Sequence, residues 1–284
     1  MNKMLSSRLT ALFLALGSAS FAHAEGEAVE IPHQDWTFSG PFGTWDEAQL
    51  QRGFVIYSLN CAACHSMGRV QYRHLSGIGL SEEHIEMLAA GQSIVDTDGS
   101  GNEIERPRLP TDTFPWGFAN KDAAAAAFGK APPDFSRLAL AREDTADYIY
   151  ALLTGYNDEK SAKLTEEARA VNPNASEVVY NNYYGHTGGQ IAMPNPLTQA
   201  AVENINYGEG VGPEYRTVDQ AARDITAFMM WAADPTMVDR KRLGVSVTLF
   251  MLLFTLVSWL AYRSVARKVH RELTENGGGP WDRD

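Results

Sequence analysis

Residues 61–65 read Cys61-Ala62-Ala63-Cys64-His65, and they hold both cysteines of the chain. A Cys-x-x-Cys-His pentad is the attachment signal of c-type haem. Two thiols three positions apart on a short helical turn can each bond a vinyl group of the haem, and His65 then presents an imidazole nitrogen to the iron. The pentad therefore predicts one covalently attached haem c, held by Cys61, Cys64 and His65.

Other interpretations of the two cysteines are a redox dithiol, half of a zinc site and a structural disulfide. None of them explains a histidine directly after Cys64. A zinc site needs a further pair of ligands, and a three-residue spacing is awkward for a purely structural bridge. We therefore favour haem attachment, and we expect no disulfide, because both thiols are then committed.

The N-terminus predicts export. Lys3 and Arg8 precede the apolar residues 9–16, and residues 22–24 (Ala-His-Ala) have the small-x-small form that signal peptidase reads. We expect residues 1–24 to be a signal peptide. The mature chain then begins near Glu25, outside the cytoplasm.

Near the C-terminus, residues 243–262 carry no formal charge and are rich in Leu, Val and Phe. This stretch is long enough to cross a hydrocarbon core of about 30 Å. Basic residues flank it on both sides, so the export signal decides its direction. We expect a periplasmic haem domain over residues 25–239, a single-pass inner-membrane anchor with flanks over 240–264, and a short cytoplasmic tail over 265–284. A buried core helix is the alternative for the apolar stretch.

Residues 25–239 are strongly acidic, with 14 basic and 31 acidic residues and a formal charge of −17. Such a field repels nucleic acid and anionic lipid, and it speeds the encounter with a basic protein. We therefore expect a basic partner and no nucleic acid, although solubility alone is another explanation of the acidity. The length of this stretch suits one domain with a substantial core.

The pattern predicts helices joined by long loops, with almost no strand alternation. Thr44 and Glu47 fit a capping box at the start of a helix that runs into the pentad. Thr217 and Gln220 fit the same box before a second amphipathic helix. A third helix is expected between the start signal at Asp144 and the stop at Gly155.

Gly53 lies inside the first predicted helix, where glycine costs about 1 kcal/mol, so it indicates a close crossing against residues 228–231. Residues 91–110 and 170–190 are rich in Gly, Asn, Asp and Pro, which predicts loops. Asp96 and Asp98 fit only part of a calcium loop, so we expect a solvated turn there.

The second axial ligand decides whether the iron is closed. A histidine–methionine pair raises the haem potential and closes the iron to outside ligands. Met193 is the candidate, because glycines before it and Pro194 after it give a loop that can approach the haem. On local sequence alone Met193 can equally be packing, and His186 is an alternative ligand. Residues without a ligand-like setting are Met67, too close to His65; Met87, Met229 and Met230, expected in the core; and His33, His74 and His84.

Several runs together make the chain resemble the bacterial cytochrome c1 family along nearly its whole mature length. The matching runs are QLQRGF (49–54), the pentad, APPDFS (131–136), YIYALLTGY (148–156), QIAMP (190–194) and FMMWAADP (228–235). The resemblance implies a mainly α fold, a class I cytochrome c-like haem domain with long loop insertions and one C-terminal transmembrane helix.

The resemblance also implies roles for single residues. It makes Met193 the second axial ligand, so that His65 and Met193 hold the iron. It implies that Pro133 packs by the haem, that Arg142 pairs with a haem propionate and that Tyr148 lies near it. Arg142 has independent chemical sense, because a guanidinium binds a carboxylate through two hydrogen bonds. An ordinary surface arginine is the alternative.

The chain departs from the family pattern at three points. Residues 127–129 read Ala-Phe-Gly where family members usually have Asn-Asn-Gly, and Asn195 stands where a second proline is expected. We expect Asn195 to loosen the loop after Met193 slightly. The additional disulfide of some bacterial members cannot form here.

The function implied by the resemblance is one-electron relay in a dimeric cytochrome bc1 complex, the ubiquinol–cytochrome c oxidoreductase of respiratory and photosynthetic chains. A mobile Rieske iron–sulfur protein would deliver the electron, a soluble or membrane-bound cytochrome c would accept it, and cytochrome b would be a membrane partner. The subunit is then no enzyme on its own, since the haem does the chemistry and the protein supplies ligands and docking surface. A membrane-anchored cytochrome shuttle or a haem enzyme or sensor are the rival classes.

Overall fold

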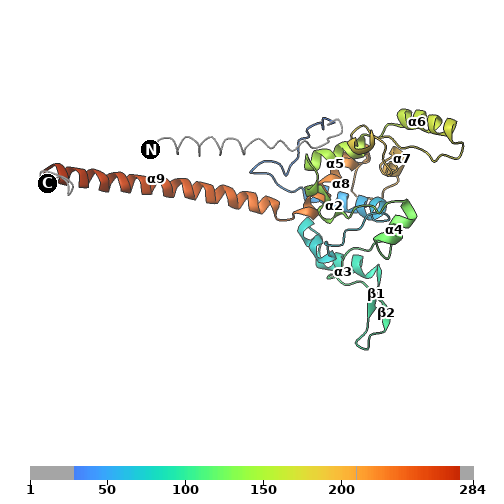
Figure 1. Ribbon diagram of the computed structural model, residues 1–284. Helices are drawn as coiled ribbons and strands as arrows, with labels where there is room; N and C mark the ends of the chain where they lie inside the picture. The colour runs from blue at the N-terminus through green and yellow to red at the C-terminus, as the bar shows by residue number, and fades with distance from the viewer. Residues whose placement is uncertain (1–28, 209, 276–284) are drawn as a thin grey trace, which may run out of the picture. The chain divides into compact units, whose positions relative to one another are not determined.

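The computed structural model describes residues 29–208 and 210–275, and its backbone is mainly helical (Figure 1). The predicted signal peptide, residues 1–24, and the end of the predicted tail, residues 276–284, lie outside the described residues. The chain forms two compact units. The larger unit takes in residues 31–155 and 193–275, and residues 156–192 belong to the smaller one.

The larger unit contains most of the helices. Its elements in chain order are α2 (Glu47–Ile56), η1 (Tyr57–Cys61), η2 (Tyr72–Ile78), α3 (Glu82–Ala90), β1 (Ser93–Thr97), β2 (Glu103–Pro107), α4 (Lys121–Phe128), η3 (Phe135–Ala141), α5 (Thr145–Thr154), α7 (Gln199–Glu203), η5 (Pro213–Tyr215), α8 (Val218–Ala233) and α9 (Met237–Glu275). Of these, η1 is one turn of π-helix, and η2, η3 and η5 are short 3-10 helices.

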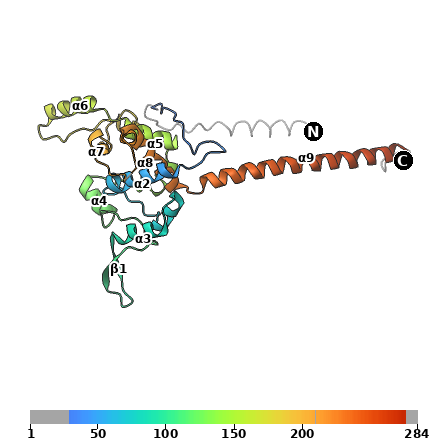
Figure 2. The same cartoon turned by 180° about the vertical axis from the view of Figure 1, so that it is seen from behind.

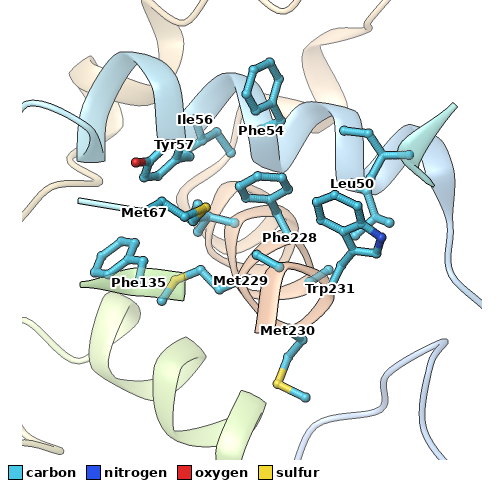
Figure 3. Packing of buried hydrophobic residues seen from close by; sticks show 14 of the residues in the cluster. Leu50, Phe54, Ile56, Tyr57, Met67, Phe135, Phe228, Met229, Met230 and Trp231 are labelled. Carbon is cyan, nitrogen blue, oxygen red and sulfur yellow. The ribbon is translucent and has the colours of Figure 1, made fainter. Parts of the chain in front are cut away.

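The core of the larger unit is the crossing of α2 and α8, as the sequence predicts. A Cβ added to Gly53 would lie 2.2 Å from the carbonyl oxygen of Asp224 and 2.6 Å from Phe228 Cβ, so only glycine fits. The ring of Phe228 lies 5.7 Å from that of Phe54 and 5.6 Å from that of Trp231. Figure 3 shows Phe228 and Trp231 pointing from α8 toward α2. The closest backbone approach is one turn earlier on α8 than the predicted residues 228–231.

A buried ion pair also joins the two helices. Arg52 donates through Nε to Asp224 Oδ2 at 2.6 Å and through a terminal nitrogen to Oδ1 at 3.0 Å. Gln220 donates to the same Oδ1 at 2.7 Å. Burial raises the pKa of Asp224, and the hydrogen bonds from Arg52 oppose that rise. The crossing is therefore stabilised both by apolar packing and by a buried ion pair with two hydrogen bonds.

Two of the predicted helix starts are confirmed, and one is wrong. Thr217 caps α8 by accepting from the backbone N–H of Gln220, and α5 lies between Asp144 and Gly155. The cap of α2 is Asp46, not Thr44, because the Asp46 carboxylate accepts from the N–H of Gln49 at 3.0 Å. Asp is at least as good an N-cap as Thr. Asp46, two positions after Thr44, was therefore an equally suitable cap for this helix.

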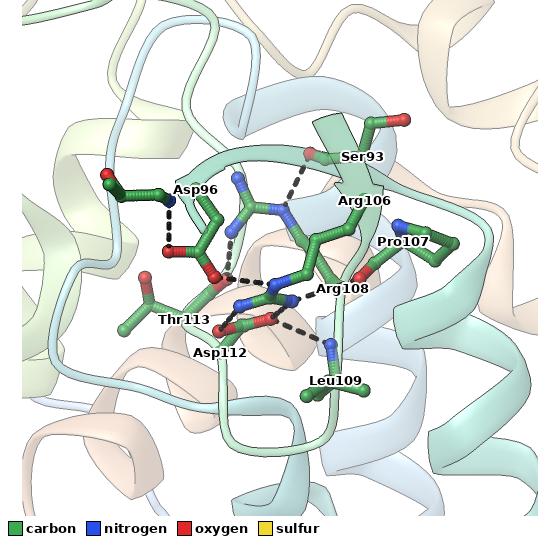
Figure 4. A network of polar contacts seen from close by, with 9 residues as sticks. Ser93, Asp96, Arg106, Pro107, Arg108, Leu109, Asp112 and Thr113 are labelled. Atoms are coloured by element: carbon green, nitrogen blue, oxygen red, sulfur yellow. Dashed lines mark hydrogen bonds and ion pairs between the residues drawn. The ribbon is translucent and has the colours of Figure 1, made fainter. Parts of the chain in front are cut away.

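The prediction of a loop over residues 91–110 is wrong, because β1 and β2 pair there as an antiparallel hairpin, the one sheet of the described residues. Arg106 on β2 binds Asp96 at 2.6 Å and Asp112 at 2.7 Å (Figure 4). Asp98 forms the turn by accepting from the N–H groups of Ser100 and Asn102. The acidic pair thus serves the hairpin and its turn, and the expectation of a turn at Asp98 is confirmed.

The smaller unit is a helix and an irregular segment. It contains α6 (Asp158–Val171) and the short 3-10 turn η4 (Gly185–Thr187). Isolated bridges pair Tyr156 with Asn181 and Tyr180 with Gln190. Gly189 has a φ of +87°, and a Cβ there would lie 2.4 Å from the Tyr180 ring, so this position requires glycine. The predicted loop over residues 170–190 is largely confirmed.

α9 continues well past the predicted anchor, to Glu275. Its first residues, Met237 and Val238, are buried in the core of the larger unit, whereas no residue of the apolar window of the helix is buried, and this window has a mean hydropathy of 2.1. This exposure argues against the alternative of a buried core helix. The helix is long and apolar enough to span a membrane (Figure 2).

Candidate haem site

The pentad forms one tight turn at the end of α2. The π-turn η1 ends at Cys61, and the carbonyl oxygen of Cys61 accepts from the N–H of Cys64 at 3.0 Å and of His65 at 2.8 Å. Cys61 is buried and Cys64 is half-buried. The backbone thus brings the two thiols and the imidazole onto one turn, as haem attachment requires.

The state of the thiols argues against the other interpretations of the pentad. Both cysteines are free, and burial raises the pKa of the Cys61 thiol to about 12. A catalytic redox dithiol needs a thiol whose pKa is lowered, because the thiolate is the nucleophile. In the part of the chain that the structure describes, no cluster of three or more His, Cys, Asp or Glu side chains could hold a zinc ion. Haem attachment is the chemistry that these residues fit.

His65 is oriented by a partner far along the chain. Its Nδ1 lies 2.9 Å from the carbonyl oxygen of Pro133, 68 positions away. Since a carbonyl oxygen only accepts, Nδ1 carries the hydrogen and Nε2 keeps its lone pair. Burial lowers the pKa of His65, which favours the neutral ring. This is the arrangement of a metal-binding histidine whose second nitrogen is fixed by a backbone carbonyl.

Aromatic side chains complete the surroundings of His65. The Phe135 ring stacks on the imidazole, with ring centres 4.1 Å apart. Tyr57 donates to the carbonyl oxygen of His65 at 3.3 Å, and Trp116 donates through Nε1 to that of Cys64 at 3.0 Å. These contacts hold the turn from three directions.

Asp134 joins the pentad region to the segment that carries Pro133. Its carboxylate accepts from Ser66 Oγ at 2.7 Å and from the N–H groups of Gly68 at 2.9 Å and Ser136 at 2.8 Å. Burial opposes ionisation, yet these hydrogen bonds lower the pKa of Asp134 below its usual value. The carbonyl of Pro133 is thereby held at His65 by an ionised side chain.

Sequence reasoning missed most of these contacts. The resemblance implies that Pro133 packs by the haem, and it gives no sign that the carbonyl oxygen of Pro133 orients His65. Asp134 directly follows Pro133 in the run APPDFS (131–136), and this adjacency could have indicated that Asp134 holds the Pro133 segment in place. Nothing in the sequence points to Trp116.

Met193 lies in the larger unit with the pentad and is half-buried. Its loop is joined to the pentad region by Asn60, which donates through Nδ2 to the carbonyl oxygen of Pro196 at 3.2 Å. Asn195 accepts from the N–H of Leu197 at 3.0 Å, and Leu197 is buried. The residue expected to loosen this loop therefore closes an Asx turn that tightens it.

The other candidates fall into distinct settings. Met67, Met229 and Met230 are buried in the core, as predicted for the last two, but Met87 is 60% exposed, so its assignment to the core is wrong. Its helix, α3, buries only Ile85 and Ala89. The histidines His33, His74 and His84 bond to Asp147, to the N–H of Gln71 and to Ser81. The side chain of His186 lies outside the described part of the chain.

Arg142 lies between η3 and α5, where its backbone is extended and its side chain exposed. Among the described residues, no carboxylate forms an ion pair with it. Asp144 and Thr145, shortly after Arg142, have φ values of 55° and 42°. Residues other than glycine adopt such positive φ values only at an energetic cost. Tyr148 follows on α5, half-buried against the core.

The family model described as "Cytochrome C1 family" matches residues 36–269. The chain belongs to the cytochrome c1 family. It is 40% identical to cytochrome c1 of Rhodospirillum rubrum over 252 residues, which cover 86% of this chain and 89% of the relative. It is 37% identical to the mitochondrial cytochrome c1 heme protein of Saccharomyces cerevisiae over 240 residues, 84% of this chain and 72% of that one.

A third relative is a longer chain. The protein named cytochrome b/c1 of Bradyrhizobium diazoefficiens is 34% identical over 280 residues, which cover 90% of this chain and 38% of that protein. Cytochrome c1 proteins bind haem c covalently, and Cys61 and Cys64 are consistent with that cofactor. The geometry of the turn and of His65 fits the same group.

Proposed function

We propose that this chain is the one-electron relay of a cytochrome bc1 complex, with haem c bonded to Cys61 and Cys64 and the iron held by His65 and Met193. The observation that carries the proposal is the bond from His65 Nδ1 to the Pro133 carbonyl, because it leaves Nε2 ready to bind iron at the attachment turn. The haem iron supplies the redox chemistry by changing between its ferric and ferrous states.

The residues around the site divide the remaining tasks. Met193 closes the iron to outside ligands and raises the potential. Arg142 balances a propionate, since a guanidinium offers two donors to a carboxylate. Tyr148 and the Pro133 segment border the haem. The subunit breaks no substrate bond, and the oxidoreductase activity belongs to the whole complex.

The partners follow from membership in the family and from the charge of the domain. Cytochrome b is the membrane partner within a dimeric complex, and a Rieske iron–sulfur protein delivers the electron. A cytochrome c that is basic around its haem edge accepts it, because a formal charge of −17 over residues 25–239 attracts such a protein over long distances. The haem domain lies in the periplasm, α9 crosses the inner membrane once, and the C-terminus is cytoplasmic.

Replacing Met193 by Leu tests the proposal. The variant should bind carbon monoxide in its ferrous form, and its midpoint potential should fall markedly, because the thioether that favours ferrous iron is gone. Absorption spectroscopy under carbon monoxide and a redox titration measure both effects. Met230→Leu is the matched control, since Met230 is buried in the core and should leave both readings unchanged.

Two outcomes would contradict the assignment. A Met193→Leu protein that binds no carbon monoxide and keeps its potential would remove Met193 from the iron. Purification of the full chain in mild detergent without a b-type cytochrome or an iron–sulfur protein would favour a membrane-anchored shuttle instead.

A further inference from the structure

Residues 37–44, here called the Phe42 loop, form a tightly built turn before α2. The N–H of Thr44 donates to the carbonyl of Thr37 at 2.8 Å, and that of Ser39 donates to the carbonyl of Trp36 at 3.0 Å. A Cβ on Gly43 would lie 2.4 Å from the carbonyl oxygen of Phe38, so only glycine fits. The loop therefore has a specified shape.

The loop has a buried aromatic base and an exposed aromatic tip. Phe38 is buried, and its ring lies 5.4 Å from that of Trp36 and 5.0 Å from that of Trp45. Phe42, at the tip, is 75% exposed. Residues 36–45 carry no formal charge, although the domain around them is strongly acidic. A rigid, uncharged element that holds a phenyl ring in water indicates a contact with an apolar partner.

The start of the membrane helix shows what that partner is. Lys241 on α9 donates through Nζ to the carbonyl oxygen of Phe38 at 3.0 Å. Lys241 precedes the uncharged residues 243–262 by two positions, about 3 Å along the helix axis. The headgroup layer outside the hydrocarbon core is about 5 to 7 Å thick on each side. The base of the loop therefore lies at the level of the lipid headgroups.

The two ribbon views agree with this position. In both, the blue segment before α2 projects to the side of the larger unit from which α9 leaves (Figures 1 and 2). The loop and α9 belong to the same compact unit. Arg242 stands beside Lys241, while Arg240 is paired with Asp234, so Lys241 and Arg242 are the basic side chains that this edge of an acidic protein offers to anionic lipid.

We propose that the Phe42 loop is a second membrane contact, in which Phe42 inserts into the outer leaflet beside α9. A surface element can bind at the boundary between headgroups and acyl chains by burying an apolar residue such as phenylalanine. With the helix alone, the domain can turn about the axis of α9. A second contact fixes that rotation and so sets the direction in which the haem site faces. The proposal depends on α9 spanning the membrane, not on the route of the electron.

A single-cysteine label tests the proposal in the full-length, haem-loaded chain. Phe42→Cys provides the only reactive thiol, because Cys61 and Cys64 are bonded to haem. The thiol is labelled with bimane, and the protein is inserted into vesicles of phosphatidylcholine and phosphatidylglycerol. Emission is compared between vesicles with and without nitroxide-labelled lipid, so that quenching by the haem cancels. Val95→Cys on β1 is the matched control, since Val95 is 66% exposed.

The expected result is lipid quenching several-fold stronger at position 42 than at position 95, with position 42 protected from iodide in the water. Equal quenching at the two positions would overturn the proposal. The same label is then read in the assembled complex with its other subunits. Loss of lipid quenching there, with protection from iodide retained, would mean that another protein covers Phe42 and would also overturn the proposal.

Discussion

His65 and Met193 come from two regions of the larger unit that are built differently. His65 follows α2 through a single π-turn, and α2 crosses α8 in the core. Met193 lies in an irregular loop, in which Asn60 donates to the Pro196 carbonyl and Asn195 closes an Asx turn. The proposed ligand His65 thus follows a regular helix of the core, whereas the proposed ligand Met193 lies in an irregular loop that Leu197 anchors to the core.

The difference teaches which property each region controls. A change in the α2–α8 crossing moves the turn that carries both thiols and His65, so it should affect haem attachment and stability together. A change in the Met193 loop leaves that turn in place, so it should affect the second ligand and the potential alone. Substitutions in the two regions should therefore have separable effects.

The largest effect is expected for Arg52→Gln. The variant leaves Asp224 buried without its cationic partner, and losing one member of a buried ion pair costs about 3 to 5 kcal/mol. Denaturant unfolding of the haem-loaded protein, followed by haem absorbance, measures the loss. Arg240→Gln is the control, because the Arg240 side chain is 60% exposed, against 11% for Arg52, and ion pairs of exposed side chains contribute about 1 kcal/mol or less.

This loss should depend on pH in a defined direction. Burial raises the pKa of Asp224 in the folded protein, so the folded state binds the proton more tightly than the unfolded state. Without Arg52 the pKa rises further. The stability deficit should then be smallest at acidic pH and grow as the pH rises through the pKa of Asp224 in the folded wild-type protein, which burial holds above its usual value. A deficit that shrinks as the pH rises would contradict the assignment.

Gly53→Ala should have the next largest effect. The new Cβ would lie 2.2 Å from the Asp224 carbonyl oxygen, so α2 and α8 must separate, at a cost of about 3 kcal/mol. The yield of haem-loaded protein should fall with the stability. Gly244→Ala on α9 meets nothing within 4 Å and serves as the control. A Gly53→Ala protein with the yield and stability of the wild type would show that the crossing does not fix the position of the pentad.

Asn60→Ala should have the smallest effect. It removes the bond to the Pro196 carbonyl, for a loss of about 1 kcal/mol. The pentad should still attach haem normally, while a fraction of the ferrous protein binds carbon monoxide because the Met193 loop is less well held. Asn102→Ala in the hairpin is the matched control. An Asn60→Ala protein that binds no carbon monoxide but attaches less haem would contradict the proposed separation between the two regions.

Local patterns predicted a large part of the fold. The pentad predicted a helical turn, Thr217 predicted the start of α8, and Gly53 predicted the close crossing, and the structure confirms all three. Each of these signals lies within one turn of helix or follows from one residue type. The hairpin over residues 93–107 was not predicted, because its two strands are short and lie among residues typical of turns. The ion pairs of Arg106 with Asp96 and Asp112 stabilise the hairpin.

The sequence by itself determined the cofactor and the apolar C-terminal helix, and it pointed to His65 as the proposed first ligand, because a contiguous motif and an uninterrupted apolar stretch carry that information. Only the tertiary structure decided how His65 is oriented, since the Pro133 carbonyl that accepts from Nδ1 is 68 positions away. It alone also placed Lys241 of α9 against Phe38, 203 positions earlier. The physical reason is the same in both cases: a backbone carbonyl has no identity in the sequence, and which donor reaches it depends on how distant segments pack.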